Sequence, residues 1–100
     1  MEGIILLFHL PERTPNKQHR KLYRLLYGGQ TSSWKGKYRY HRRGMLDDVA
    51  HRKIQSGVEI VREEDAARLR KAIQATGATV EVRVVRLTPK DEKGLGLSTS

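Results

Sequence analysis

Apolar residues fill both alternating sets of positions between Ile4 and Phe8. A strand with one solvated face alternates apolar and polar residues, whereas a strand covered on both faces reads as a continuous apolar run. The segment Gly3–His9 therefore predicts a central strand of a sheet, and the strand should end before Pro11.

Residues 15–27 show helical spacing. Thr14 is a residue type that commonly caps a helix start, and Pro15 suits the first helical turn. We predict a helix from Pro15 to Tyr27, ended by Gly28-Gly29. Three leucines should face the core and four cations the opposite side, namely Leu22, Leu25 and Leu26 against Lys17, Arg20, Lys21 and Arg24.

The stretch from Ser33 to Arg43 alternates with a period of two and predicts a second strand, roughly Ser33–Arg42. One side carries Trp34, Gly36, Tyr38 and Tyr40, and the other carries Lys35, Lys37, Arg39, His41 and Arg43, with Arg42 ending the aromatic row. Two interpretations stay open. The aromatic side chains stack on bases beside cations that bind phosphates, or they pack in the core and the cationic side is a solvated edge.

The remaining pattern completes two β-α halves. Gln55–Arg62 predicts a third strand, apolar residues from Ala66 to Thr76 keep helical spacing, and Thr79–Leu87 alternates as a fourth strand. The order β-α-β-β-α-β predicts an α+β ferredoxin-like plait, a four-stranded antiparallel sheet with two helices on one face. In that topology Gly3–His9 and Gln55–Arg62 are central, and the charged stretch Ser33–Arg42 is an edge strand.

The domain organisation follows from this order. Residues 1–88 should form a single ferredoxin-like domain, and residues 89–100 a mobile C-terminal tail. Thr88-Pro89-Lys90-Asp91 could start one short helical turn. A lone plait leaves one sheet face open, although the first strand is apolar on both sides. A second copy of the chain is the simplest cover, so we expect a homodimer through the sheet.

Charge points to the class of partner. Of the 100 residues, 31% are charged, and the net charge is +9. Residues 9–53 hold twelve Lys or Arg against three acidic residues, a local balance of +9 that equals the total. Such a bias favours an anionic partner, nucleic acid before membrane. The apolar run Ile4–Phe8 is too short for a membrane span, and there is no Cys; we expect a cytoplasmic protein with no membrane partner.

The candidate nucleic-acid-binding residues come from the predicted helix and strand. Arg20, Arg24, Lys35, Lys37, Arg39, Arg42 and Arg43 should contact phosphates, and Trp34, Tyr38 and Tyr40 should stack on bases or anchor the strand in the core. RNA-recognition modules carry their stacking aromatics on the central strands, where this chain offers only Phe8. An edge position therefore favours contacts to the backbone of either DNA or RNA.

Candidate catalytic chemistry is sparse. The four histidines lack the spacing of zinc ligands, and neither a phosphate-binding glycine loop nor a nucleophile motif is present. Asp47-Asp48 is a paired carboxylate that could hold Mg²⁺ through water, although adjacent acids in a polar loop are more often solvated. We assign no catalytic residue, no metal-binding residue and no cofactor. Mg²⁺ would be needed only if the protein were a metal-dependent nuclease.

Several short motifs resemble one family. An apolar strand runs into Phe8–Glu12, a helix with spaced Arg and Leu follows, Arg52–Val58 leads into the third strand, and Glu64-Asp65 opens the second helix. Over residues 3–86 this pattern resembles the small CRISPR-associated plait proteins, the second Cas protein that forms the hub of spacer integration. It also resembles the C-terminal domain of phenylacetate-pathway repressors.

The resemblance implies a plait homodimer that binds duplex nucleic acid, with metal-dependent nuclease activity in some members. The chain departs from the family at two places. His9 stands where the family has an Asp at the end of the first strand, and Gly29–His51 is longer than the usual link. We therefore expect a non-catalytic nucleic-acid-binding protein. The alternatives are a metal-dependent nuclease and a protein-interaction subunit of a nucleoprotein complex.

Overall fold

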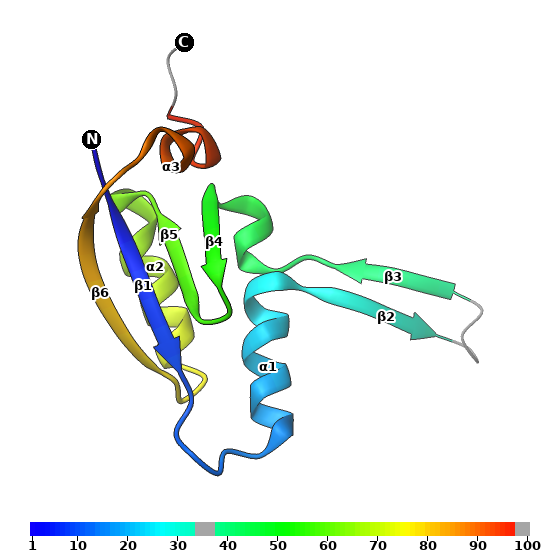
Figure 1. The fold of residues 1–100 in the computed structure, drawn as a ribbon. Coiled ribbons are helices and arrows are strands. Elements are labelled where there is room, and N and C mark those ends of the chain that lie inside the picture. The colour runs from blue at the N-terminus through cyan, green and yellow to red at the C-terminus, as the bar shows by residue number, and fades with distance from the viewer. Residues whose placement is uncertain (34–37, 98–100) are drawn as a thin grey trace.

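The computed structural model describes residues 1–33 and 38–97, with the backbone alone for 30–33 and 38–42. Six strands, three α-helices and one 3-10 helix follow one another in these residues (Figure 1). In chain order they are β1 (Glu2–His9), α1 (Asn16–Tyr27), β2 (Gly29–Ser33), β3 (Tyr38–Arg42), η1 (Met45–Asp48), β4 (His51–Gln55), β5 (Val58–Val61), α2 (Glu63–Gln74), β6 (Thr79–Arg86) and α3 (Pro89–Gly94).

Four of the strands form an antiparallel sheet in the order β4-β5-β1-β6. The apolar strand β1 is central as predicted, since it pairs with β5 on one side and along its whole length with β6 on the other. The arrangement is that of a ferredoxin-like plait, which confirms the predicted fold class.

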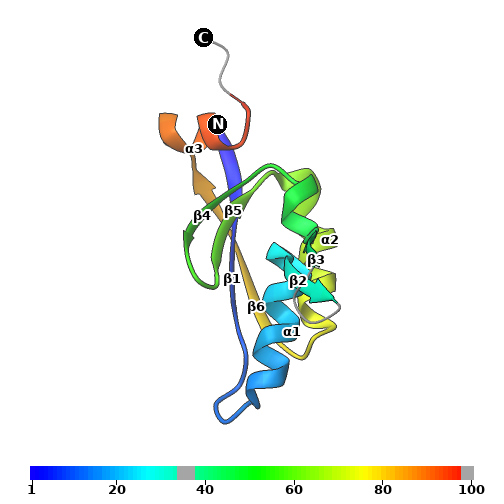
Figure 2. The same cartoon turned by 90° about the vertical axis from the view of Figure 1, so that its right-hand side faces the viewer.

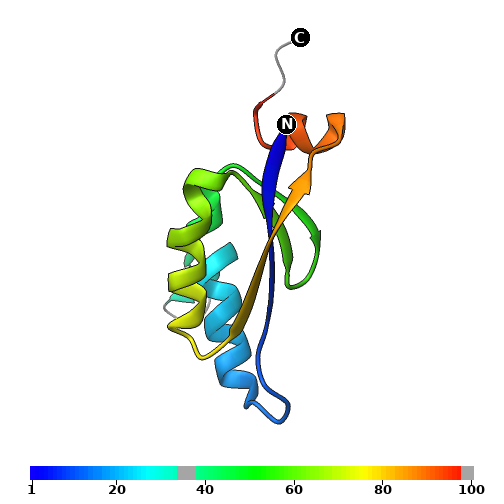
Figure 3. The ribbon, with the colours of Figure 1, turned by 90° about the vertical axis from the view of Figure 1, so that its left-hand side faces the viewer.

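Helices α1 and α2 lie together on one face of the sheet, and Figures 2 and 3 show this layer from opposite sides. Their apolar stripes close the main core against β1, through residues that include Leu6, Leu22, Leu26, Leu69 and Ile73. The cap of α1 differs from the prediction. Pro15 occupies the N-cap position, and the Thr14 hydroxyl instead donates a hydrogen bond to the Pro11 carbonyl, closing the turn before the helix.

The prediction that Ser33–Arg42 forms an edge strand of the main sheet is wrong. Residues 38–42 form β3, which pairs with β2 in a separate two-stranded sheet, and the edge of the main sheet is β4. A strand that finds an antiparallel partner a few residues away closes a much shorter loop than one that crosses the domain. The edge position goes to β4 because the short turn Ser56-Gly57 leads directly into β5, with Gly57 at φ +85.

The β2–β3 hairpin, which we call the arm, projects away from the plait beyond the end of α1 (Figure 1). Its described residues, 29–33 and 38–42, pair with no strand of the main sheet. The radius of gyration is 15.1 Å, against about 13 Å for a compact chain of this length. The arm is thus an appendage inserted between the first helix and the edge strand of an otherwise complete plait.

The segment after β6 is folded. Residues Pro89–Gly94 form α3, and Leu95 is fully buried in a second apolar cluster with Ile60 and Leu87. Sequence reasoning assigned residues 89–100 to a tail, whereas the ordered packing continues to Leu97. Helix α3 lies at the end of the sheet, toward the face opposite α1 and α2 (Figures 2 and 3). Part of the face that was expected to need a second copy is therefore covered by the chain itself.

Candidate nucleic-acid interface

The outward face of α1 is strongly basic. Leu22 and Leu26 are buried on the inner side of the helix, and the cations Lys17, Arg20, Lys21 and Arg24 are exposed on its outer side. A hollow of about 790 Å³ lies between α1 and the turn that follows α2, lined by Lys17, Gln18, Arg20, Lys21, Arg24 and Thr76. The helix thus presents its charge along a concave surface.

A second hollow of about 510 Å³ continues the first, because Lys21, Arg24 and Thr76 line both. It extends the surface to Arg43 and to Asp48 of η1. We call the five cations Lys17, Arg20, Lys21, Arg24 and Arg43 the basic groove. Among the described residues that line these two hollows, Asp48 is the one acidic residue, and its carboxylate accepts a hydrogen bond from Arg43.

The ion pair between Arg43 and Asp48 lies at the surface, where a ligand can reach both side chains. Their side chains are 67% and 65% exposed, and exposed pairs contribute little to stability, on the order of 0 to 1 kcal/mol. A phosphate can therefore replace Asp48 as the partner of Arg43 at small cost. The groove as a whole is a site of positive potential for an anionic ligand.

The arm begins where the groove ends. Helix α1 stops at Tyr27, and β2 starts two residues later at Gly29. Arg43 directly follows β3, and the next residue, Gly44, lies against the backbone of Leu26 and Gly28. This close approach fixes the root of the arm beside the C-terminal end of α1, where the groove ends.

The structure brings together three of the predicted residues, Arg20, Arg24 and Arg43. Four others lie on β3, where the backbone register places them at defined positions: Tyr38 opposite Ser33, Arg39 opposite Ser32, Tyr40 opposite Thr31 and Arg42 opposite Gly29. Trp34, Lys35 and Lys37 lie outside the described residues. Lys17 and Lys21 belong to the groove but were absent from the predicted set. Their helical spacing with Arg20 and Arg24 is a signal that was available in the sequence.

A buried acidic residue lies on the inner side of the same helix. Glu59 of β5 is 1% exposed, and it faces α1, where the Tyr27 hydroxyl donates a hydrogen bond to its Oε2. Its other oxygen, Oε1, has no hydrogen-bond partner among the described residues. Lys53, the register partner of Glu59 on β4, places its Nζ 4.6 Å from the centre of the Tyr27 ring.

Burial raises the pKa of the Glu59 carboxyl group above its ordinary value, although the hydrogen bond from Tyr27 and the charges of His51 and Lys53 oppose the rise. Burial also raises the pKa of the Tyr27 hydroxyl, with a further contribution from Glu59, so that this hydroxyl stays a proton donor. Sequence reasoning missed the pair. Val58 and Ile60 on either side of Glu59 gave no sign that the acidic residue faces the core.

The acidic residues beside the groove are engaged by the protein. Oδ2 of Asp47 accepts a hydrogen bond from the Gly44 N–H at 2.8 Å, and Asp48 pairs with Arg43. His51 donates through Nδ1 to the Val49 carbonyl at 2.8 Å. Among residues 1–33 and 38–97, no group of three or more His, Cys, Asp or Glu is arranged to hold a metal ion.

Comparison of the chain with models of known protein families, with curated proteins and with solved structures gave no match. The resemblance to the CRISPR-associated plait proteins therefore stays a prediction. No helix within the described part of the chain is long and apolar enough to cross a membrane.

Proposed function

We propose that the protein binds nucleic acid through the basic groove and the arm, without chemical conversion of its partner. The observation that carries this proposal is the gathering of Lys17, Arg20, Lys21, Arg24 and Arg43 along two connected hollows whose described lining includes a single acidic residue. Lys and Arg side chains at such a surface neutralise phosphates and release counterions, which is the main source of affinity for nucleic acid.

The described lining of the groove favours contacts to the sugar-phosphate backbone. Its uncharged members are Gln18, Leu25, Gly44, Met45 and Thr76, and none is aromatic. Phosphate contacts position a nucleic acid without reading its sequence. Binding at the groove should therefore be tolerant of sequence and sensitive to salt.

The experiment is a binding titration by fluorescence anisotropy at several salt concentrations. If the five cations each contact one phosphate of a duplex, the logarithm of the binding constant should fall by about 4.5 per tenfold rise in salt. Between about 50 mM and about 200 mM salt this amounts to a loss of affinity of about 500-fold. Affinity that does not change with salt, or absence of binding at low salt, would contradict the proposal.

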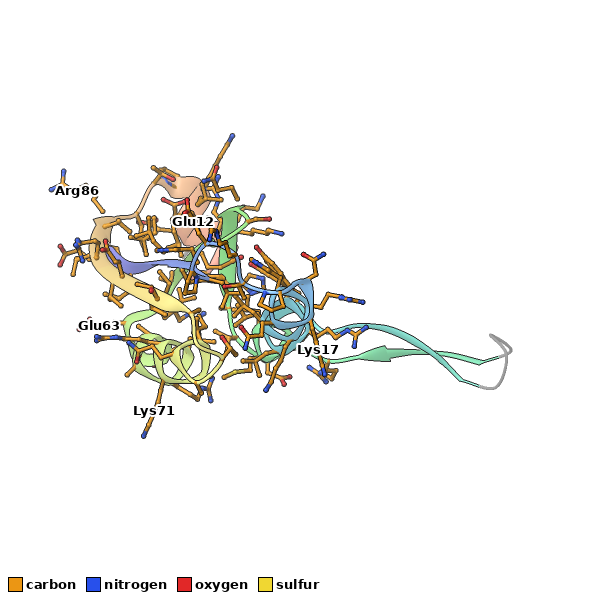
Figure 4. All side chains as sticks on the ribbon, turned by 90° about the horizontal axis from the view of Figure 1, so that it is seen from below. Glu12, Lys17, Glu63, Lys71 and Arg86 are labelled. Carbon is orange, nitrogen blue, oxygen red and sulfur yellow. The ribbon has the colours of Figure 1, made fainter. Side chains whose placement is uncertain are left out.

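A charge-matched pair of variants isolates the groove. Arg20→Gln/Arg24→Gln should weaken binding and reduce the salt slope on a duplex by about 1.8. Arg86→Gln/Lys90→Gln removes the same charge from exposed positions on β6 and α3 and should leave the slope unchanged. Figure 4 shows Arg86 at the far side of the molecule from Lys17 of α1. If the two double variants reduce the affinity and the salt slope equally, binding depends on net charge alone and not on the groove.

We also propose a homodimer through the part of the sheet that α3 leaves uncovered. Leu7 of β1 is 37% exposed and Ile54 of β4 is 49% exposed. A second copy would bury these side chains and place two basic grooves on one particle. Sedimentation equilibrium should show a dimer that dissociates in Leu7→Lys; a monomer in the wild-type chain at high concentration would refute it.

A further inference from the structure

Two tyrosines form a stacked pair on α1, the helix that carries four cations of the basic groove. The ring centroids of Tyr23 and Tyr27 are 6.0 Å apart, and the ring planes are inclined by 18°. Tyr23 is 36% exposed, whereas Tyr27 is half-buried between α1 and the sheet. The outer ring of the pair is thus available to a ligand, and the inner ring supports it.

The inner ring is held by contacts from two strands. Its hydroxyl donates to the buried Glu59 of β5, and Lys53 of β4 places its Nζ 4.6 Å from the ring centre. These contacts fix the orientation of Tyr27 and, through stacking, the orientation of Tyr23. An aromatic surface that is already ordered loses little conformational entropy when a ligand stacks on it.

The cations of the groove adjoin this pair on the same helix. Arg20 is three residues before Tyr23, and Arg24 is three residues before Tyr27. Residues three apart are neighbours on a helix surface. A planar aromatic surface and phosphate-binding guanidinium groups therefore lie side by side, which is the combination that single-stranded nucleic acids require.

We propose that the exposed ring of Tyr23 is a stacking site for an unpaired nucleobase, with Arg20 and Arg24 holding the flanking phosphates. This inference rests on the proposed binding of nucleic acid by α1, and it assigns the partner a segment with at least one unpaired base. A paired base inside a duplex shows only its edges, so it cannot use the face of Tyr23. The role of the Tyr27–Glu59 pair is to position Tyr23.

The test compares Tyr23→Ala with Tyr23→Phe on a fluorescently labelled thymidine oligonucleotide and on a matched duplex. Tyr23→Ala should weaken binding of the single strand by about 5- to 150-fold, the range for loss of one base–aromatic stack. Tyr23→Phe keeps the ring and should retain wild-type affinity. Both variants should keep the wild-type salt slope, because stacking releases no counterion, and both should bind the duplex as the wild type does.

The outcomes separate this inference from the proposal on which it depends. If Tyr23→Ala weakens single strand and duplex equally, or weakens neither, the stacking site is refuted while groove binding stands. If the wild-type chain binds neither ligand at low salt, both fail. A second readout does not depend on affinity. Irradiation of a 5-iodouracil oligonucleotide bound to the wild-type chain should cross-link Tyr23, and a cross-link that maps elsewhere would contradict the assignment.

Discussion

The Tyr27 hydroxyl donates its hydrogen bond to Glu59, a carboxylate that is 1% exposed and lies on the second central strand of the sheet. This contact joins the last residue of α1 to β5 across 32 positions of sequence. It therefore ties the helix that carries the basic groove, at the end from which the arm begins, to the centre of the plait.

The raised pKa of Glu59 predicts how stability depends on pH. In the folded chain the carboxyl group binds its proton more readily than in the unfolded chain, where its ordinary pKa is 4.5. Above pH 4.5 the folded state therefore holds more protons, and stability falls as the pH rises through the raised pKa. Glu59→Gln should remove this loss, so the variant should gain stability relative to wild type as the pH rises.

The measurement is urea denaturation of the wild type and Glu59→Gln at a series of pH values from 4.5 upward. Glu12→Gln removes one negative charge from an exposed loop and serves as the control. A difference between wild type and Glu59→Gln that stays constant over this range would show that burial does not perturb Glu59.

The N-terminal cap of α3 can be removed by a single substitution at Thr88. The Thr88 hydroxyl accepts a hydrogen bond from the Asp91 N–H at 3.2 Å, and the Asp91 carboxylate accepts one from the Thr88 N–H at 2.9 Å. Thr88→Ala should lower the free energy of unfolding by about 1 kcal/mol. Thr88→Ser keeps the oxygen and should lose much less. If Thr88→Ala and Thr88→Ser lose the same stability in thermal denaturation, the effect comes from the lost methyl group and not from the hydroxyl.

Adding a single methyl group at Gly44 should have a large effect on the stability of the fold. A Cβ at this position would clash with the backbone of Leu26 and Gly28, where neither a rotamer change nor a small shift can relieve the contact. Gly44→Ala should destabilise the fold by about 3 kcal/mol or more. Gly29→Ala is the matched control, because a Cβ there meets no atom of the described residues within 4 Å. A mild effect of Gly44→Ala would mean that the root of the arm can move away from α1.

Shortening the arm should reduce binding of nucleic acid and leave the plait folded. Thr31 and Tyr40 are register partners, so replacing residues 32–39 by Asn-Gly gives a shortened hairpin with a favourable two-residue turn. Stability should change by less than about 1 kcal/mol, because shortening an external loop changes little chain entropy. The replacement removes Lys35, Lys37 and Arg39, and it should reduce the salt slope on a duplex by up to about 2.7.

Circular dichroism and binding titrations on the shortened chain check both parts of this prediction. An unchanged salt slope would exclude these three cations as phosphate contacts and leave the groove as the binding surface. Loss of cooperative unfolding would instead show that the arm supports the plait.

The fold could be predicted because its signals are local and periodic. The doubly apolar run Ile4–Phe8 placed β1 at the centre of the sheet, and leucines at helical spacing defined the buried face of α1. Which strand each strand pairs with is not determined by its own local sequence, so this part of the fold could not be predicted in the same way. Alternation in Ser33–Arg42 predicted an extended segment correctly over Tyr38–Arg42, but the same alternation suits a hairpin and an edge strand equally.

The site was predictable in part for the same reason. Charge marked α1 and Arg43, since a basic face is visible as a spacing of cations along a helix. The juxtaposition of α1, η1 and the end of α2 depends on tertiary packing, as does the burial of Glu59 against Tyr27. Pairings between residues this far apart leave no periodic signal in the sequence.

The pairing of β1 has a consequence for synthesis of the chain. This strand is made before both of its neighbours, β5 and β6, which follow α1 and the arm, and its last register partner is Arg86. While the ribosome adds the intervening residues, an apolar strand without hydrogen-bonded neighbours is exposed to other nascent chains. We expect the excess of positive charge between β1 and β5 to oppose association of that intermediate until the sheet can close.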